Sequence, residues 1–268
     1  MPKLEVDGIQ LHWEALGQGE PVAFLNGVLM TTKSWNLQTS VLSRHYRCLL
    51  HDFRGQLLSD KPLQPWTMED HAQDLKALLD HLGVESCHII GTSYGGEVGL
   101  IFASRWPDRV KSLSVISSVS EVAPELDHAV SQWRQAALET PETLYRIMLP
   151  TTFSTDFVES NPKVIRLGEE RLRSCPPDFF RAFAQLVDTF RQLDITARLD
   201  KIRCPTLVMV GEQDALKSPS YSRIIADRIP GSELVLIPGA GHAVILEKPN
   251  EVNAALLEFL EKHREPVV

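Results

Sequence analysis

The pentapeptide Gly91-Thr92-Ser93-Tyr94-Gly95 is the feature that most limits how this chain can fold. It follows a short apolar run that predicts a strand over residues 86–90, and a helical pattern over residues 97–106 comes after it. A serine at a strand-to-helix turn of this kind has a strained backbone, and small flanking residues let strand and helix pass close to it. The helix N-terminus directs its free N–H groups toward negative charge forming near the serine. These features predict that Ser93 is a nucleophile.

Short apolar runs alternate with helical patterns along much of the chain, which predicts an α/β fold with a mostly parallel central sheet flanked by helices. The chain has 268 residues, 43% of them hydrophobic, and can therefore bury a large core. Further helices are expected over residues 68–82 and 250–263. The expected strands are residues 9–15, 21–25, 47–51, 86–90, 110–117, 205–211 and 233–237.

Residues 121–194 interrupt this alternation, because they show only helical periodicity, punctuated by prolines. We therefore expect an α/β core formed by residues 1–120 and 195–268, with residues 121–194 inserted as a helical cap over Ser93. The cap is rich in apolar and aromatic side chains, which favours a small, largely apolar substrate, although most of these side chains are expected to hold the cap together.

A serine hydroxyl is a poor nucleophile without a base and an acid, and the chain offers both after later strands. Asp214 follows the strand at 205–211, and His242 follows the strand at 233–237. A serine, an acid and a histidine in this order along the chain are expected when each of the three residues lies in a loop after a different strand of the sheet. We therefore predict Ser93, Asp214 and His242 as the catalytic residues.

Two other side chains compete for these roles. His51 ends a strand beside Asp52, but it precedes the serine, and that edge of the sheet is not expected to supply the base. Glu212 lies in the same loop as Asp214. Asp214 is favoured because a residue four positions beyond the apolar end of the strand can turn back over the sheet.

These residues resemble the α/β-hydrolase fold superfamily over nearly the whole chain, in particular its serine hydrolases and esterases. Asp52-Phe53-Arg54-Gly55-Gln56 is similar to the D-x-R-G-x-G-x-S segment of that family. Leu57-Leu58-Ser59 stands where the second glycine and the serine are expected, so this loop is altered. The resemblance implies structural roles for Asp52 and Arg54.

The resemblance also indicates where an oxyanion hole would form, since a tetrahedral intermediate needs two backbone N–H donors, each worth about 3–4 kcal/mol of barrier. Tyr94, directly after the nucleophile, is expected to supply one donor. The loop after the strand at 21–25 is expected to supply the other from Val28, with Leu29 as the fallback. Asn26 stands where the family usually has a histidine.

The loop that begins at Asn26 has a second, local resemblance. Its pattern Asn-Gly-x-x-x-Thr-Thr-x-Ser-aromatic over residues 26–35 is similar to bacterial acyltransferases that act on 3-hydroxyacyl thioesters. The serine turn of that subgroup reads Ser-x-Ser-Trp-Gly, unlike the turn at Ser93. An acyltransferase or thioesterase is therefore the first alternative function.

The main expectation is a serine hydrolase that cleaves carboxylic ester, thioester or lactone bonds through an acyl-enzyme. A carbon–carbon bond hydrolase, a perhydrolase and a receptor-like non-catalytic binder are further alternatives, while Ser93 argues against the dehalogenases and epoxide hydrolases of this fold, whose nucleophile is an aspartate. The residues expected to line the substrate pocket are Asn26, Leu29, Trp133, Met148 and Val244.

Charge and motifs narrow the expected partners to a small-molecule ester or thioester. The net charge of −8 argues against a nucleic-acid groove. No apolar run reaches the roughly 18 residues of a membrane span, and residues 1–7 lack the apolar region of a signal peptide, so a cytoplasmic location is expected. The four cysteines form no CxxC pair, and no metal or nucleotide motif is present, so neither a metal nor a cofactor is expected.

Overall fold

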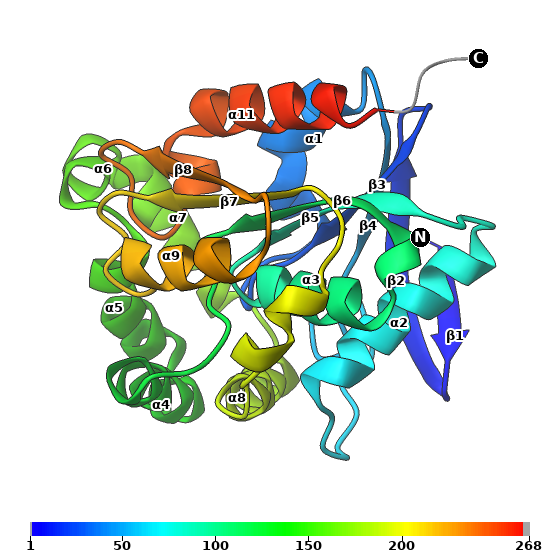
Figure 1. The fold of residues 1–268 in the computed structure, drawn as a ribbon. Helices are drawn as coiled ribbons and strands as arrows, with labels where there is room; N and C mark the ends of the chain where they lie inside the picture. Colours follow the sequence, from blue (N-terminus) through cyan, green and yellow to red (C-terminus); the bar gives the residue numbers. More distant parts are fainter. Residues whose placement is uncertain (1, 265–268) are drawn as a thin grey trace.

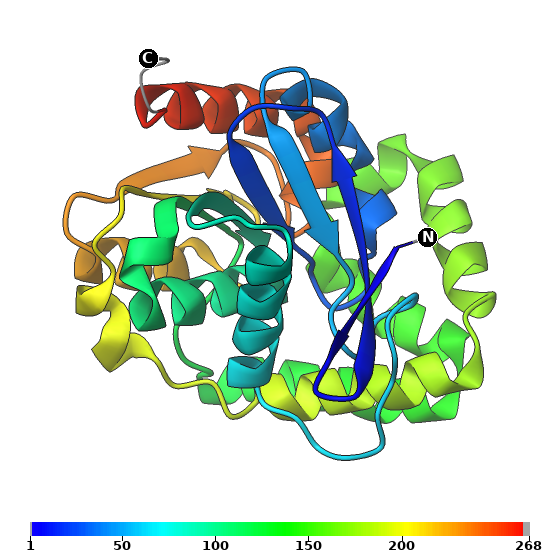
Figure 2. The ribbon, with the colours of Figure 1, turned by 90° about the vertical axis from the view of Figure 1, so that its right-hand side faces the viewer.

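The computed structural model describes residues 2–264, which form one eight-stranded sheet with helices on both faces (Figure 1 and Figure 2). In chain order the strands are β1 (Lys3–Val6), β2 (Ile9–Leu16), β3 (Pro21–Leu25), β4 (Arg47–His51), β5 (Cys87–Thr92), β6 (Val110–Ile116), β7 (Thr206–Gly211) and β8 (Glu233–Ile237). Their order across the sheet is β1-β2-β4-β3-β5-β6-β7-β8. Strands β3 to β8 are parallel, whereas β2 pairs antiparallel with β1 and β4. The predicted fold class is confirmed.

Helices cover both faces of the sheet. Helix α1 (Asn36–Leu42) and helix α11 (Pro249–Lys262) lie on one face, and α2 (Met68–His81), α3 (Tyr94–Arg105) and α9 (Pro219–Arg228) lie on the other (Figure 1). Short helical segments complete the core: α10 (Val244–Glu247) and the 3-10 helices η1 (Thr32–Trp35), η2 (Pro107–Arg109) and η3 (Thr196–Lys201).

Five α-helices lie between β6 and η3, and they gather below and to the left of the sheet in Figure 1. An isolated antiparallel bridge between Glu121 and Asp194 joins the two chain segments that lead into and out of this group. Residues 1 and 265–268, which the expected core ranges include, lie outside the described residues. The five helices are α4 (Pro124–Glu139), α5 (Pro141–Thr152), α6 (Thr155–Ser160), α7 (Pro162–Arg173) and α8 (Pro177–Phe190).

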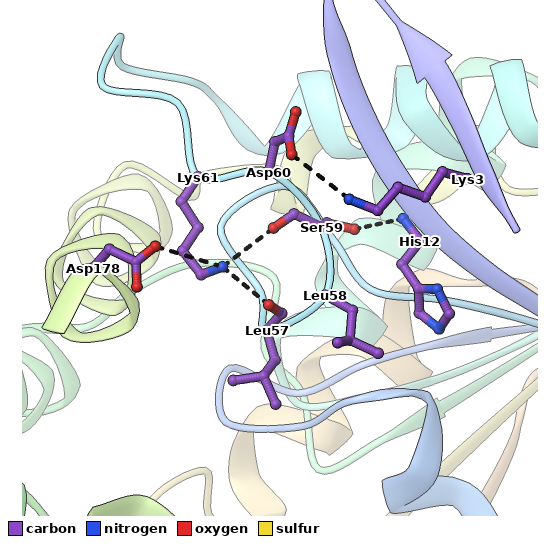
Figure 3. A pocket seen from close by; sticks show the side chains of 8 residues that line it. All are labelled: Lys3, His12, Leu57, Leu58, Ser59, Asp60, Lys61 and Asp178. Carbon is purple, nitrogen blue, oxygen red and sulfur yellow. Dashed lines mark hydrogen bonds and ion pairs between the residues drawn. The ribbon is translucent and has the colours of Figure 1, made fainter. Parts of the chain in front are cut away.

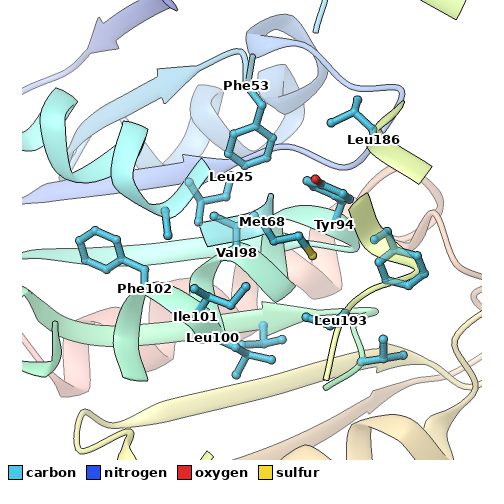
Figure 4. Packing of buried hydrophobic residues seen from close by; sticks show 14 of the residues in the cluster. Leu25, Phe53, Met68, Tyr94, Val98, Leu100, Ile101, Phe102, Leu186 and Leu193 are labelled. Atoms are coloured by element: carbon cyan, nitrogen blue, oxygen red, sulfur yellow. The ribbon is translucent and has the colours of Figure 1, made fainter. Parts of the chain in front are cut away.

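Successive side chains along the parallel strands point to opposite faces of the sheet, and this divides the core into two layers. In β3, Val22 and Phe24 pack beneath α1 and α11, whereas Ala23 and Leu25 face α2 and α3. Figure 4 shows part of the second layer, in which Phe53 and Tyr94 lie near Leu186 of α8. Each large apolar side chain buried in this way stabilises the fold by about 1.5–3 kcal/mol. This packing fixes α3, and with it the turn that precedes α3.

The ends of α2 follow from local chemistry. Thr67 caps the helix and forms a reciprocal capping box with Asp70, and Gly83 follows the helix at a φ of 66°. The predicted helix over 68–82 is confirmed to within one residue.

The sequence reading missed strand β1, which forms a hairpin with β2. Asp7 and Gly8 form its two-residue turn, with φ values of 50° and 78°. Two positive φ angles in a two-residue turn are typical of type I′ hairpins, for which Asp-Gly is a favoured pair. The dipeptide Asp7-Gly8 could therefore have indicated this hairpin from the sequence. Helices α1 and α9 were also not predicted.

Candidate active site

Ser93 lies on the turn between β5 and α3, at a φ of 52° and a ψ of −123°. This conformation costs a non-glycine residue about 1–3 kcal/mol, and it persists because the surroundings fix it. The Ser93 N–H donates to the Ile116 carbonyl at 2.8 Å, and the Ser118 hydroxyl donates to the Ser93 carbonyl at 2.9 Å. A Cβ on Gly95 would overlap the Leu25 carbonyl oxygen, so this position must be glycine. The turn therefore holds the hydroxyl of Ser93 at the carboxyl end of the sheet.

The three side chains predicted to be catalytic form one chain of hydrogen bonds. His242 Nε2 lies 3.0 Å from Ser93 Oγ, and His242 Nδ1 lies 2.8 Å from Asp214 Oδ2. The other oxygen of Asp214 accepts backbone N–H groups of Leu216 at 3.0 Å and Lys217 at 2.7 Å. A histidine held in this way can take the serine proton on Nε2 while its Nδ1–H donates to the carboxylate.

Backbone hydrogen bonds fix the loops that carry Asp214 and His242 relative to one another. The Gln213 N–H donates to the Ala240 carbonyl at 2.8 Å, so the acid loop and the histidine loop meet directly. The histidine loop is also tied to α5, because the Ala243 N–H donates to the Thr152 carbonyl at 2.8 Å.

The two rival residues lie elsewhere. Glu212 is exposed, and its carboxylate accepts the Gly239 N–H at 3.3 Å instead of meeting His242. His51 is 1% exposed, and neither of its ring nitrogens has a hydrogen-bond partner among residues 2–264. Burial away from water lowers the pKa of His51 to about 4, which keeps its imidazole neutral.

The two predicted oxyanion donors flank the serine. Tyr94 is the first residue of α3, so its N–H has no acceptor in a preceding helical turn. Val28 lines the same cavity as Ser93 and Tyr94, and a Cβ on the neighbouring Gly27 would lie 3.6 Å from Ser93 Cβ. Both backbone segments are therefore near the hydroxyl group that would attack.

Asn26 holds the loop that carries Val28, because all its polar atoms are used inside the protein. Its Nδ2 donates to the Asp52 carboxylate at 3.2 Å and to Gln56 Oε1 at 3.0 Å, and its Oδ1 accepts the Trp35 indole N–H at 2.8 Å. Gln56 in turn donates to the Gly27 carbonyl at 2.7 Å. The segment that resembles the D-x-R-G-x-G-x-S motif thus supports, through these hydrogen bonds, the loop that carries Val28.

Arg54 of the same segment is also a structural residue. Its guanidinium makes two hydrogen bonds, of 2.7 and 2.6 Å, to the buried carboxylate of Asp74 on α2. This bidentate pair ties the braced loop to a core helix.

The cavity beside Ser93 is small and mostly apolar. Its volume is about 20 Å³, which is room for little more than one water molecule. Helices α4 and α8 form its roof. Its lining consists of Val28, Ser93, Tyr94, Val130, Trp133, Val187, Phe190, Leu216 and Lys217.

Of the five residues expected to line the pocket, only Trp133 belongs to this lining. Asn26 is buried and fully engaged in bracing the loop. Leu29 is half-buried against the core layer, and Met148 is buried within the helices that follow β6. Val244 is buried in the other core layer, against α11.

Lys217 and Glu97 are charged residues at this site that sequence reasoning missed. Lys217 Nζ lies 3.3 Å from Ser93 Oγ and 2.8 Å from Glu97 Oε1. Burial raises the pKa of Glu97, while the adjacent ammonium of Lys217 opposes that rise. The available signals were spacings: Lys217 comes three residues after Asp214, and Glu97 comes one helical turn after Ser93.

A second, wider hollow of about 360 Å³ lies away from Ser93, between β1, the loop after β4 and α8 (Figure 3). Its polar groups pair with one another: Lys61 lies 3.9 Å from Asp178, and it donates to the Leu57 carbonyl at 3.0 Å. The hollow contains no residue of the Ser93–His242–Asp214 chain. We assign no chemistry to it.

Within residues 2–264, no three histidine, cysteine, aspartate or glutamate side chains are placed to hold a metal ion together. In the same part of the chain, no helix has both the length and the apolar character needed to cross a bilayer.

Known proteins share this architecture along nearly the whole chain. The family model of the alpha/beta hydrolase fold matches residues 20–249. A protein named as the carbamate hydrolase RutD, from Caulobacter sp. strain K31, is 30% identical over 261 residues, which cover 95% of this chain and 96% of that protein.

Solved structures of other proteins have the same fold. An α/β-hydrolase enzyme, MGS-M2 from a deep-sea metagenome library, has a TM-score of 0.94 at 26% identity and covers 100% of this chain and 99% of its own. A thermophilic esterase from Thermogutta terrifontis has a TM-score of 0.88 at 30% identity, with 99% and 100% covered. The chain is an enzyme of the hydrolase class and belongs to the α/β-hydrolase fold family.

Proposed function

We propose that this enzyme is a serine hydrolase that cleaves carboxylic ester bonds, including thioesters and lactones, of a small and largely apolar substrate. The observation that carries the proposal is the continuous hydrogen-bonded chain from Ser93 Oγ through His242 to Asp214. The named activities of similar proteins support the bond class, since they include an enol-lactonase from Burkholderia xenovorans LB400 and the thermophilic esterase.

In the proposed reaction, Ser93 Oγ attacks the carbonyl carbon of the substrate while its proton passes to His242 Nε2. The N–H groups of Val28 and Tyr94 stabilise the oxyanion of the tetrahedral intermediate. His242 then donates that proton to the leaving alcohol or thiol, which gives an acyl-enzyme. Water attacks the acyl carbonyl and loses a proton to His242, which returns it to Ser93 Oγ as the acid product leaves.

We also propose that residues 121–194 act as a cap on a core made of residues 1–120 and 195–268. Trp133 and Val130 from α4 and Val187 and Phe190 from α8 cover the cavity at Ser93. Their bulk leaves little free space, which supports a preference for short acyl groups.

Hydrolysis of 4-nitrophenyl acetate, butyrate and octanoate by the wild type and by Ser93→Ala tests the proposal. Loss of the nucleophile should lower turnover by several orders of magnitude, up to about 10^6-fold. Equal rates for the two proteins would overturn it. Far-UV circular dichroism of both proteins shows whether the substitution has altered the fold.

A second candidate function is acyl transfer to a hydroxyl or thiol acceptor other than water. One similarity favours it: the dihydrolipoyllysine-residue acetyltransferase component of an acetoin cleaving system from Pseudomonas putida is 32% identical over 270 residues, covering 97% of this chain and 69% of that protein. The acyl-enzyme would be the same, and only the attacking group would differ. Faster consumption of a thioester after addition of an acceptor, with the transferred product detected, would support this function.

A further inference from the structure

Lys217 places a buried ammonium group directly beside the predicted nucleophile. Its side chain is 4% exposed, and its Nζ lies 3.3 Å from Ser93 Oγ and 4.5 Å from the centre of the Phe190 ring. Lysine is almost never buried this deeply unless it is paired, and here Glu97 Oε1 accepts from it at 2.8 Å.

A purely structural role for the Lys217–Glu97 ion pair does not explain why the ammonium lies beside Ser93. Burying two charges usually gains little stability over apolar packing, and a pair that served only the core would have no reason to face Ser93. Glu97 holds the lysine from behind, because its carboxylate also accepts the Val119 N–H at 2.9 Å. The ammonium is thereby fixed on the wall of the cavity that contains the serine hydroxyl.

The ammonium has three donor hydrogens. Among residues 2–264, its hydrogen bonds go to two oxygen acceptors, Glu97 Oε1 and Ser93 Oγ. One donor therefore remains for a bound molecule, in a cavity whose other polar side-chain groups are the Ser93 hydroxyl, the Tyr94 phenol and the Trp133 indole N–H.

The charges of Lys217 and Glu97 determine which kind of substrate group can accept the remaining hydrogen bond. Glu97 already compensates the positive charge of Lys217, so a substrate carboxylate in this dry cavity would be an additional buried charge without its own partner. A neutral hydroxyl or carbonyl oxygen would accept the remaining donor without that cost.

Distance sets the position of that oxygen on the substrate. The scissile carbonyl carbon must approach Ser93 Oγ to about 3–3.5 Å before attack. Lys217 Nζ lies 3.3 Å from the same Oγ, so a substrate whose acyl side turns toward Lys217 can place an oxygen on the carbon next to the scissile carbonyl within hydrogen-bond reach of the ammonium.

We propose that Lys217 is a substrate-recognition residue that donates to a neutral oxygen on the carbon adjacent to the scissile carbonyl. The preferred substrates are then esters of small 2-hydroxy or 2-oxo acids. This inference rests on the proposed ester hydrolase function and narrows its substrate class.

Ethyl lactate and ethyl isobutyrate test the inference, because they differ only by a hydroxyl in place of a methyl group. We expect the wild type to prefer the better enantiomer of ethyl lactate by about ten- to a hundredfold in kcat/KM, the effect of one hydrogen bond to a charged donor. In Lys217→Met this preference should fall to about one. The surface variant Lys76→Met, which carries the same substitution, should keep the preference of the wild type.

The ratio of the two kcat/KM values does not depend on the fraction of enzyme that is folded. The double variant Glu97→Gln/Lys217→Met, which removes both charges, should show the same loss of preference as Lys217→Met. A wild-type ratio near one, or a ratio that survives in Lys217→Met or the double variant, would overturn the inference while leaving ester hydrolysis intact. If the wild type cleaved neither ethyl ester nor 4-nitrophenyl acetate faster than Ser93→Ala, the proposed function itself would fail, and this inference with it.

Discussion

The backbone N–H of Lys217 donates to Asp214 Oδ1 at 2.7 Å, so the turn that orients the carboxylate also sets the start of the lysine side chain beside Ser93. Asp214 Oδ2 remains free to pair with His242 at 2.8 Å. One four-residue turn thus places both a carboxylate and an ammonium at the site, and changes in it should affect catalysis and recognition together.

Asp214→Asn should lower kcat for 4-nitrophenyl acetate by about 10^3–10^4-fold, because an amide that faces His242 favours the wrong imidazole tautomer. Glu212→Gln is the matched control in the same loop, since within residues 2–264 the carboxylate of Glu212 hydrogen-bonds the Gly239 N–H and not His242, and it should change kcat less than about twofold. Steady-state kinetics of the two variants would decide between the acids. A larger loss in Glu212→Gln than in Asp214→Asn would contradict the assignment.

Trp133→Ala should shift the preference toward longer acyl chains, because it removes the indole from the roof of the cavity. We expect the ratio of kcat/KM for 4-nitrophenyl octanoate over acetate to rise about tenfold. Trp133 is 5% exposed, so the variant should also lose about 3–5 kcal/mol of unfolding free energy. Trp106→Ala removes an indole that does not line the cavity, and an equal shift in that control would count against the role of Trp133.

Lys217→Met should lower the free energy of unfolding by about 3–5 kcal/mol at pH 8, because it leaves the carboxylate of Glu97 buried without its cation. Burial already raises the pKa of Glu97, and loss of Lys217 raises it further. As pH rises, Glu97 loses its proton at a lower pH in the unfolded chain than in the folded protein. The free energy of unfolding therefore falls as pH rises above the ordinary pKa of glutamate.

The loss in Lys217→Met should therefore be smaller at pH 5 than at pH 8, as measured by urea denaturation. Glu97→Gln/Lys217→Met should remove this difference between the two pH values. A pH-independent loss that persisted in the double variant would show that packing, and not charge, stabilises the pair.

His51 should make the protein sensitive to acid. Its pKa is lowered to about 4 in the folded protein by burial, whereas an unfolded histidine titrates near 6.5. Between these values the unfolded state binds more protons, so stability is full above about pH 6.5 and is lost as pH falls toward 4. The contribution of this one group is about 3 kcal/mol.

The substitution His51→Leu should reduce the loss of urea stability between pH 7 and pH 4, since in the described part of the chain the ring makes no hydrogen bond that leucine would remove. His45→Leu, at an exposed position, is the control and should leave the acid profile unchanged. Identical pH profiles for His51→Leu and the wild type would be incompatible with this origin of acid sensitivity.

Much of the sheet could be predicted because its strands are buried apolar runs with clear ends. Strands β3, β4 and β8 lie at the predicted residues, whereas the edge strand β1, which was missed, depends on turn chemistry at Asp7-Gly8 rather than on hydrophobicity. The start of α3 was placed three residues late, because Ser93 alone forms the turn and Tyr94 already begins the helix.

At the site, chain order and the position of each residue after its strand predicted that Asp214 and His242 lie near Ser93, since loops after parallel strands meet at one edge of the sheet, and the structure brings the three side chains together. The lining of the cavity was less predictable. Val244 and Met148 are apolar residues near functional segments, but their side chains pack into cores, and sequence carries no sign of that direction. Lys217 was overlooked because a single lysine in a loop is usually a surface residue.

The short link between α5 and the histidine loop couples two parts of the molecule that are far apart in sequence. The Ala243 N–H binds the Thr152 carbonyl, and the Glu247 carboxylate binds both the Ser154 hydroxyl and the Gly241 N–H. Residues on either side of His242 are therefore held by the end of α5 and the segment that follows it. Displacement of this segment by mutation would shift the backbone that carries His242, so the geometry of the Ser93–His242 hydrogen bond depends on residues that contact neither side chain.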